Sequence, residues 1–161
     1  MQITLINHTD SWDEIAELQA DVYGTEFVEE TDVLKRKWEV SPNSCLIYRV
    51  ATGEIAAYLL AHSWSSPKPP KLFEPLPICE QSEQLFLHDL AVSKRLKGLG
   101  VGRQMVEQLI SLARNAGYKH ILLVSVQSSV EFWQKMGFVS LNAPVDVCYG
   151  DGAQLMSQQI K

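Results

Sequence analysis

Residues 90–103 read Leu90-Ala91-Val92-Ser93-Lys94-Arg95-Leu96-Lys97-Gly98-Leu99-Gly100-Val101-Gly102-Arg103. The segment begins at the end of a mostly apolar stretch, residues 85–92, which is typical of a buried strand. A basic, glycine-rich turn follows, and after it residues 100–116 carry apolar side chains at helical spacing. The sequence therefore predicts a strand, a glycine-rich turn and a long helix in direct succession.

The glycine-rich turn has the composition of an anion-binding site. Glycines allow backbone N–H groups to approach a pyrophosphate closely, and a helix N-terminus adds unpaired donors and a favourable dipole. Arg95, Lys97 and Arg103 add positive charge where phosphates would lie. Two other phosphate-binding motifs are excluded. A P-loop requires Gly-Lys-Ser/Thr where this chain has Gly102-Arg103-Gln104, and a dinucleotide fold requires G-x-G-x-x-G spacing.

The elements around this motif predict one mixed central β-sheet flanked by helices, in the α/β (α+β) class. No internal repeat or second domain is visible, so residues 1–161 are expected to form a single domain. Strands are predicted at residues 2–7, 45–51, 55–61, 85–92, 121–126, 138–141 and 153–160, with a hairpin turn at Thr52-Gly53. Helices are predicted around residues 15–22, 33–38, 100–116 and 129–136, the first capped by Thr9, Asp10 or Ser11 and the second by Thr31-Asp32.

A Pro- and Ser-rich segment, residues 64–82, separates the third and fourth predicted strands. It is too long for an ordinary connection, and long loops in compact domains are usually functional lids or binding loops. The alternative is a disordered insertion.

Composition and charge narrow the class of protein. The formal charge of −5 argues against nucleic-acid binding, because phosphate contacts favour basic faces. Cys45, Cys79 and Cys148 lack metal-ligand spacing, so no metal is expected, and an odd count without CxxC fits a reducing compartment. No apolar run approaches a membrane span, and residues 1–6 lack the features of a signal peptide. The prediction is a cytoplasmic protein with no membrane partner.

Two segments resemble motifs of the GNAT family of N-acetyltransferases. Residues 97–102 resemble the family's coenzyme A-binding motif Gln/Arg-x-x-Gly-x-Gly/Ala, with Lys97 keeping the positive charge of the usual first residue. Further on, Phe132-Trp133-Gln134-Lys135-Met136-Gly137-Phe138 resembles the family's Phe-Tyr-x-x-x-Gly-Phe segment. The two segments occur in the family's order, with a predicted helix and strand between them.

The resemblance implies a sheet that splays between its fourth and fifth strands, with the pantetheine arm of acetyl-CoA in the cleft. The acceptor would enter from the side of the first two helices and residues 64–82. The activity implied is transfer of an acetyl group from acetyl-CoA to a primary amine, by direct attack in a ternary complex. The residues implied in cofactor binding are Leu90, Ala91, Val92, Lys97, Gly98, Leu99, Gly100, Val101, Gly102, Arg103, Phe132, Trp133 and Lys135.

The acid–base residues are less clear from the sequence. The family commonly uses the tyrosine of its Phe-Tyr segment as the acid, and Trp133 stands there instead. Strand alternation predicts that Phe86, His88, Leu90 and Val92 share one face, with Asp89 on the other. Residues 88–92 resemble the His-x-Leu-Ala-Val of the arylalkylamine N-acetyltransferase branch, although Phe86 replaces that branch's first histidine. His88 is therefore the predicted base, the alternative being a hydrogen-bonded core histidine.

Other groups near the predicted cleft leave the acid and the acceptor open. Tyr149 is a predicted catalytic acid, with Cys148 as an alternative and Tyr23 as an acceptor-site wall. An acidic run comprises Glu26, Glu29, Glu30 and Asp32. It either attracts a cationic amine or forms a solvated face. The sequence favours a small-molecule amine. A peptide N-acetyltransferase and a non-catalytic acyl-CoA sensor are the competing functions, and homodimer formation is left open.

Overall fold

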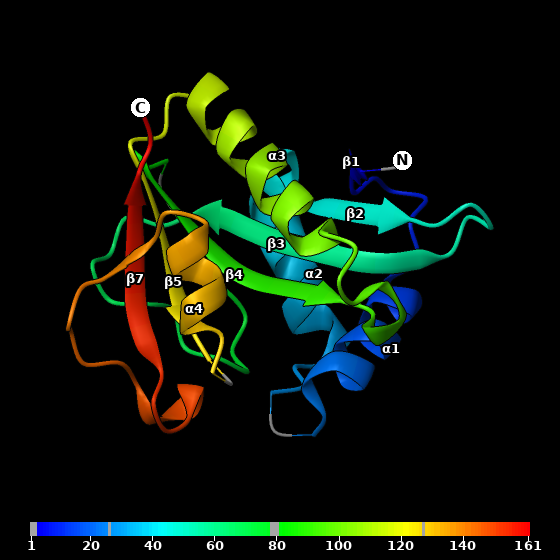
Figure 1. The fold of residues 1–161 in the computed structure, drawn as a ribbon, viewed down its shortest axis with the longest axis horizontal. Coiled ribbons are helices and arrows are strands. Elements are labelled where there is room, and N and C mark those ends of the chain that lie inside the picture. Colours follow the sequence, from blue (N-terminus) through cyan, green and yellow to red (C-terminus); the bar gives the residue numbers. More distant parts are fainter. Residues whose placement is uncertain (1–2, 26, 78–80, 127) are drawn as a thin grey trace.

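The computed structural model describes residues 3–25, 27–77, 81–126 and 128–161, and in them seven strands form one sheet in the order β1-β2-β3-β4-β5-β7-β6 (Figure 1). The strands are β1 Ile3–Leu5, β2 Leu46–Arg49, β3 Ile55–Ser63, β4 Gln84–Val92, β5 His120–Ser125, β6 Val139–Ser140 and β7 Gln154–Gln159. The helices are α1 Trp12–Tyr23, α2 Thr31–Val40, α3 Val101–Asn115 and α4 Val130–Lys135. Short 3-10 turns occupy η1 Pro42–Ser44, η2 Lys94–Leu96 and η3 Val147–Tyr149.

The predicted order of elements and the single mixed sheet are confirmed. Ser11 caps α1, since its hydroxyl accepts a hydrogen bond from the backbone N–H of Glu14. The predicted Thr31-Asp32 cap is wrong, because Thr31 is already helical and Glu30 occupies the cap position without a side-chain hydrogen bond. Gln2 of the first predicted strand lies outside the described residues.

The sheet splays between its fourth and fifth strands, as predicted. All strand pairs are antiparallel except β4 with β5. This parallel pair is formed only between residues 84–87 and residues 120–123. Beyond Leu87 and Leu123 the two strands diverge, and a cleft opens between them.

Helices cover both faces of the sheet (Figure 1). Helices α1 and α2 pack on β3 and β4 from one side, around a core that includes Ile15, Leu34 and Tyr58. Helix α3 packs on the other side, where its Leu109 and the α4 residue Trp133 belong to the second core. Among the described residues, no helix is both long and apolar enough to cross a membrane.

A β-bulge interrupts β4 beside the cleft. Leu60 of β3 pairs with Asp89 while the next residue of β3, Ala61, pairs with Leu87, so His88 is the additional residue. Leu90 packs against the core on the α3 side, as does Val92, whereas His88 and Asp89 both bond to side chains on the α1–α2 side. The prediction that His88 shares a face with Leu90 and Val92, opposite Asp89, is therefore wrong. The bulge shifts the alternation by one residue.

Residues 64–82, called the strap from here on, are tied to the body by hydrogen bonds. The side-chain amide of Gln84 donates to the carbonyl oxygens of Trp64 and Ser66, at 2.8 and 2.9 Å. Further along, Arg36 donates to the carbonyl of Leu76 at 3.3 Å. The described residues of the strap thus have a defined path over the sheet, which favours the binding-loop interpretation over a disordered insertion.

Candidate active site

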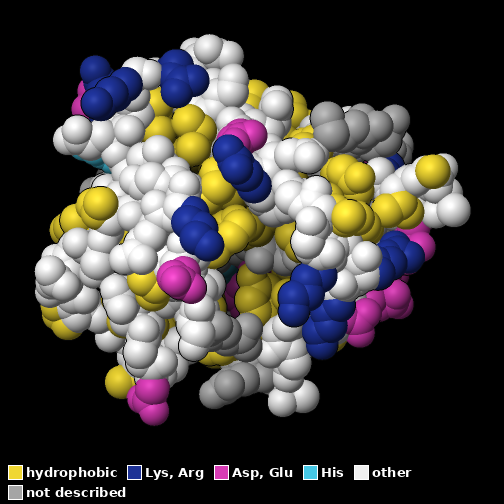
Figure 2. All heavy atoms as spheres, in the orientation of Figure 1, with side chains coloured by type: hydrophobic (Ala, Val, Ile, Leu, Met, Phe, Trp, Pro, Cys, Tyr) yellow, Lys and Arg dark blue, Asp and Glu magenta, His cyan; other side chains and the backbone are white. Residues whose placement is uncertain are grey.

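The cleft between β4 and β5 has a volume of about 270 Å³. One wall carries Leu90 and Val92 of β4, and the other carries Val124 next to the α4 residues Phe132 and Trp133. In the space-filling view a hollow lies at this place, lined by apolar side chains and flanked by Lys and Arg side chains (Figure 2). An extended, mostly apolar chain with a charged end would match this lining.

The glycine-rich turn forms the entrance of the cleft. Gly98 and Gly100 have φ angles of 80° and 74°, the left-handed region that glycine adopts at little cost, and Gly100 is the N-cap of α3. The first N–H groups of a helix have no partner within it. Gly102 lies in the cleft wall, where an added Cβ would stand 3.5 Å from side-chain atoms of Phe132 and Val92. The first N–H groups of α3 thus remain as donors next to the part of the cleft wall that Gly102 forms, as an anion site requires.

The cations predicted around the turn are all on the surface. Arg95 pairs with Glu54, and Arg103 pairs with Glu107 one helical turn later. Lys97 and Lys135 are exposed. Exposed ion pairs contribute little to stability, so these side chains can rearrange toward a phosphate group at small cost.

Trp133 fills part of the cleft wall with a buried apolar ring. Its indole ring packs edge-on against Phe132 and Phe138, with ring centroids 4.9 and 5.5 Å apart. An indole N–H has no acid function at neutral pH. Any acid for the departing group must therefore come from another residue or from solvent.

A second, smaller cavity of about 40 Å³ adjoins the cleft. The two cavities share five lining residues, which are Tyr23, His88, Asp89, Val124 and Val126. Phe27 and the strap residue Leu72 add apolar surface to the smaller cavity. The bulge in β4 therefore lies where the two cavities meet, and a group that bridges them would touch it.

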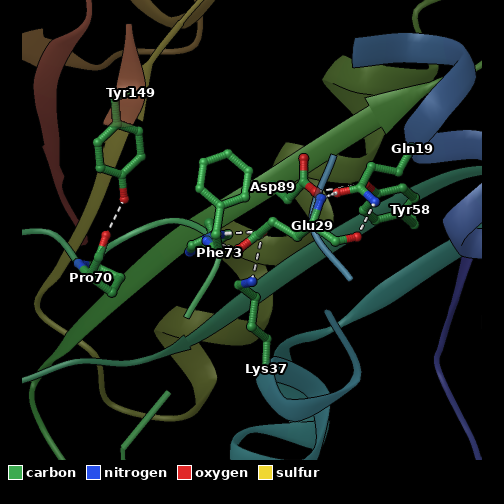
Figure 3. Close-up of polar contacts among 9 residues, drawn as sticks. Gln19, Glu29, Lys37, Tyr58, Pro70, Phe73, Asp89 and Tyr149 are labelled. Carbon is green, nitrogen blue, oxygen red and sulfur yellow. Dashed lines mark hydrogen bonds and ion pairs between the residues drawn. The ribbon is translucent and has the colours of Figure 1, made fainter. Parts of the chain in front are cut away.

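Beside the small cavity the carboxylate of Glu29 connects three parts of the molecule (Figure 3). It accepts hydrogen bonds from Lys37 Nζ of α2 at 2.8 Å, from His88 Nε2 at 3.2 Å and from the backbone N–H of Phe73 in the strap at 2.9 Å. The Gln19 side chain holds the Glu29 backbone at both its N–H and its carbonyl. Burial raises the pKa of Glu29, but the hydrogen bonds and charges of His88 and Lys37 outweigh it and lower the pKa to about 2.

His88 is held in one tautomer by this carboxylate. Nε2 faces Glu29 and so carries the proton, which leaves Nδ1 as a bare acceptor. Nδ1 is buried and has no hydrogen-bond partner within the described part of the chain. Burial, reinforced by the charge of Lys37, lowers the pKa of His88 to about 4. The imidazole is therefore neutral at pH 7, in the form that can take a proton.

Asp89 is a site residue that the sequence analysis missed. Its carboxylate accepts a hydrogen bond from the Tyr58 hydroxyl at 2.6 Å, and the nearby Tyr23 hydroxyl donates to the Leu90 carbonyl at 2.7 Å. Burial raises the pKa of Asp89 to about 6, although hydrogen bonds from Tyr23 and Tyr58 lower it. Strand alternation placed Asp89 on the wrong face, and no sequence signal marks the bulge.

Tyr149, the predicted acid, lies in the wall of the small cavity. Its hydroxyl donates to the carbonyl of Pro70 in the strap (Figure 3). Burial raises its pKa above the ordinary value for tyrosine. Cys148 lines neither cavity.

Of the described residues in the acidic run, Glu29 is the buried one. Glu30 and Asp32 are exposed, and Glu26 lies outside the described residues. Within the described residues no cluster of three or more His, Cys, Asp or Glu could hold a metal ion.

Comparison with known proteins identifies the family to which the sequence is similar. A sequence model described as the Acetyltransferase (GNAT) family matches residues 12–138. Among solved structures the chain is similar to Ard1 from Thermoplasma volcanium, with a TM-score of 0.74, 19% identity, and coverage of 99% of this chain and 97% of that one.

Two further structures share the fold. One is the ribosomal-protein-S18-alanine N-acetyltransferase from Escherichia coli, with a TM-score of 0.71, 16% identity and coverage of 99% and 94%. The other is the GphF GNAT-like decarboxylase in complex with isobutyryl-CoA, with a TM-score of 0.74, 15% identity and coverage of 100% of both chains. At these identities the likeness shows a common fold.

Proposed function

The chain belongs to the acetyltransferase (GNAT) family, and we propose that it transfers an acetyl group from acetyl-CoA to the primary amine of a small molecule. The observation that carries this proposal is the cleft between β4 and β5. It runs from the glycine-rich turn at the N-terminus of α3 to the buried polar residues at the bulge. The GNAT-like decarboxylase, solved with isobutyryl-CoA, supports an acyl-CoA as the donor.

In the proposed complex different residues bind different parts of coenzyme A. The backbone N–H groups of Gly98 and of residues 100–103 bind the pyrophosphate, assisted by the charges of Lys97 and Arg103, whereas the Leu99 N–H donates to the Leu96 carbonyl. Residues 90–92 pair with the pantetheine arm through their backbone. Phe132 and Trp133 form the apolar wall opposite, and Lys135 on α4 adds a cation at the rim.

The proposed reaction is direct attack in a ternary complex. The amine nitrogen forms a bond to the acetyl carbonyl carbon, the carbon–sulfur bond breaks, and coenzyme A leaves as a thiolate. The attacking amine must first lose the proton of its ammonium form, and His88 Nδ1 accepts that proton. Tyr149 returns a proton to the sulfur in this proposal, for which its hydroxyl must release the Pro70 carbonyl.

The closed acceptor end favours a small molecule. The strap is fixed to Glu29 through Phe73 and to Tyr149 through Pro70. The strap residue Leu72 lines the acceptor cavity of about 40 Å³, and this confined space supports a compact acceptor. A peptide amine is the second candidate, favoured by the likeness to the ribosomal-protein-S18-alanine N-acetyltransferase. The comparisons support the family and not the arylalkylamine branch, so the likeness of residues 88–92 to that branch remains a prediction.

A substrate screen tests the proposed function. The protein is incubated with acetyl-CoA and a panel of small amines and peptides, released thiol is recorded, and coenzyme A binding is measured by calorimetry. Turnover with small amines and not peptides is expected. Turnover with peptides alone would favour the second candidate. Coenzyme A binding without turnover of any acceptor would favour the non-catalytic sensor, and absence of binding would refute the proposal.

The compartment and the assembly are also proposals. Among the described cysteines, Cys45 and Cys148 are free thiols, which suits a reducing compartment such as the cytoplasm. Homodimer formation is tested by the molar mass in solution.

A further inference from the structure

The buried charges around the acceptor cavity do not cancel. Glu29 and Lys37 form an ion pair with side chains 2% and 1% exposed, so their charges neutralise each other. The Glu29 carboxylate is also occupied by His88 and by the Phe73 N–H. It therefore has little capacity to attract a further cation.

Asp89 is the buried carboxylate that lacks a counter-ion. The residue is 8% exposed, and its hydrogen-bond donors Tyr58 and Tyr23 are uncharged phenols. No Lys, Arg or His of the described residues lies within ion-pair distance, 4.0 Å, of its oxygens. Burial lowers the pKa of the adjacent His88 to about 4, so its imidazole adds no positive charge at pH 7. The charge of Lys37 lowers the pKa of Asp89, but Lys37 is paired with Glu29, so the cluster of Glu29, Lys37 and Asp89 keeps one net negative charge.

Ionisation of a buried carboxylate that lacks a counter-ion costs free energy, and a cation bound beside it reduces that cost. Removing a carboxylate from water without a partner charge disfavours its ionised form, in agreement with the raised pKa of about 6. An opposite charge within about 4–6 Å would restore the ionised form. Asp89 lines both the cleft and the small cavity, so a group at their junction would lie against it.

We propose that Asp89 is the counter-ion of the acceptor substrate, which binds as an ammonium ion. The substrate class is a small primary alkylamine with a compact apolar substituent, because Phe27, Leu72 and Val126 give the small cavity an apolar part beside its polar residues. Alcohols and weakly basic arylamines, which carry no charge at pH 7, are disfavoured. The proposal rests on the proposed function, in which the acceptor occupies this end of the cleft. Asp89 determines specificity, and removal of the proton stays with His88.

Kinetics of an Asp89→Asn variant give the first test. Asparagine keeps the shape and can still accept from Tyr58, so only the charge is lost. The KM for cationic amines found in the screen should rise about 10- to 100-fold, while the Kd for coenzyme A stays unchanged. Asp13→Asn is the matched control, since it removes the same charge from an exposed position. Asp13 lies in the first turn of α1, at the opposite end of the helix from the cavity residue Tyr23. An unaltered KM in Asp89→Asn, or a screen that yields only uncharged acceptors, would overturn the proposal.

Nuclear magnetic resonance on the wild-type protein gives a test that needs no turnover and no variant. The side-chain carboxyl carbon of Asp89 is titrated with acid alone, then with n-butylammonium, and then with 1-butanol, which has the same chain without the charge. Butylammonium should lower the pKa of Asp89 and butanol should not. Equal effects, or no effect of either, would refute the ammonium site. Failure of coenzyme A binding would refute the proposed function and leave this result standing.

Discussion

At the scale of single residues, the positions of His88 and Asp89 both follow from the bulge in β4. Two consecutive strand residues normally face opposite sides of a sheet. Here both bond to partners on the α1–α2 side, His88 to Glu29 and Asp89 to Tyr58. One strand therefore delivers two titratable groups to one end of the cleft. Their pKa values shift in opposite directions, because burial disfavours imidazolium and carboxylate alike.

Replacement of His88 by glutamine tests its role as the base. We expect kcat at pH 7 to fall about 10- to 1,000-fold, the usual contribution of one acid–base group. Because the pKa of His88 is about 4, the wild-type kcat should decline only as the pH approaches 4, and the variant should lack this decline. Stopped assays across pH 4–8 measure both.

His120→Gln is the control, because His120 begins β5 and lines neither cavity. Its kcat and pH profile should match those of the wild type. If His88→Gln also keeps wild-type turnover and the same pH dependence, His88 is a structural residue of the core.

At the scale of elements, the turn into α3 combines helix geometry with glycine conformation. Gly100→Val should abolish coenzyme A binding, because valine disfavours a φ of 74° and the turn would move its N–H groups away from the phosphates. Calorimetry measures the affinity, and circular dichroism checks that the chain still folds.

Gly53→Val is the matched control. Gly53 has a φ of 90° in the turn between β2 and β3, far from the glycine-rich motif in the sequence, and open space around it like Gly100. It should cost similar backbone strain and leave coenzyme A affinity unchanged. Undiminished binding in Gly100→Val would exclude this turn as the pyrophosphate site.

The strap is the second element with a defined test. Tyr149→Phe removes the hydroxyl that donates to Pro70, so the strap should loosen over the acceptor cavity. If fixing the strap is the main role of Tyr149, the KM for the amine should rise about 10-fold, corresponding to the loss of about 1.4 kcal/mol from one hydrogen bond. Coenzyme A affinity should not change. A fall in kcat is the result expected from the proposed role of Tyr149 as the acid, and an unchanged kcat would exclude that role.

At the scale of the whole molecule, Glu29 holds α1, α2, the strap and β4 together. Its folded-state pKa of about 2 lies below the ordinary value of 4.5, so ionised Glu29 stabilises the fold above pH 4.5. This stability, on the order of 3 kcal/mol, should be lost as the pH falls from 4.5 to about 2. Glu29→Gln should thus be less stable at pH 7, and the difference from the wild type should vanish near pH 2.

Urea unfolding at a series of pH values measures this difference. The exposed Glu131→Gln on α4 is the control and should shift the unfolding midpoint little at any pH. A difference between Glu29→Gln and the wild type that stays constant with pH would mean that folding does not lower the pKa of Glu29.

Much of the fold was predictable because it depends on local patterns. Apolar periodicity located the helices and strands, and the spacing of Gly98, Gly100 and Gly102 marked the turn that opens α3. The candidate site was harder to predict from the sequence, since the bulge at His88 is a property of strand pairing. The Glu29 contacts to Phe73 and His88 join residues 44 and 59 positions apart in the chain, and no short-range pattern encodes them.

The divergence of β4 and β5 also leaves, within the described residues, two strand edges in the interior of the sheet that do not pair with each other. Beyond Leu87 and Leu123 the facing backbones lack each other as partners, and Tyr23 satisfies the carbonyl of Leu90. Such edges are templates for strands of other molecules and promote aggregation. In the proposed complex the amide-bearing pantetheine arm takes the place of the missing strand. Acyl-CoA would then act as a solubilising ligand as well as a reactant, and coenzyme-depleted protein would be the form that self-associates.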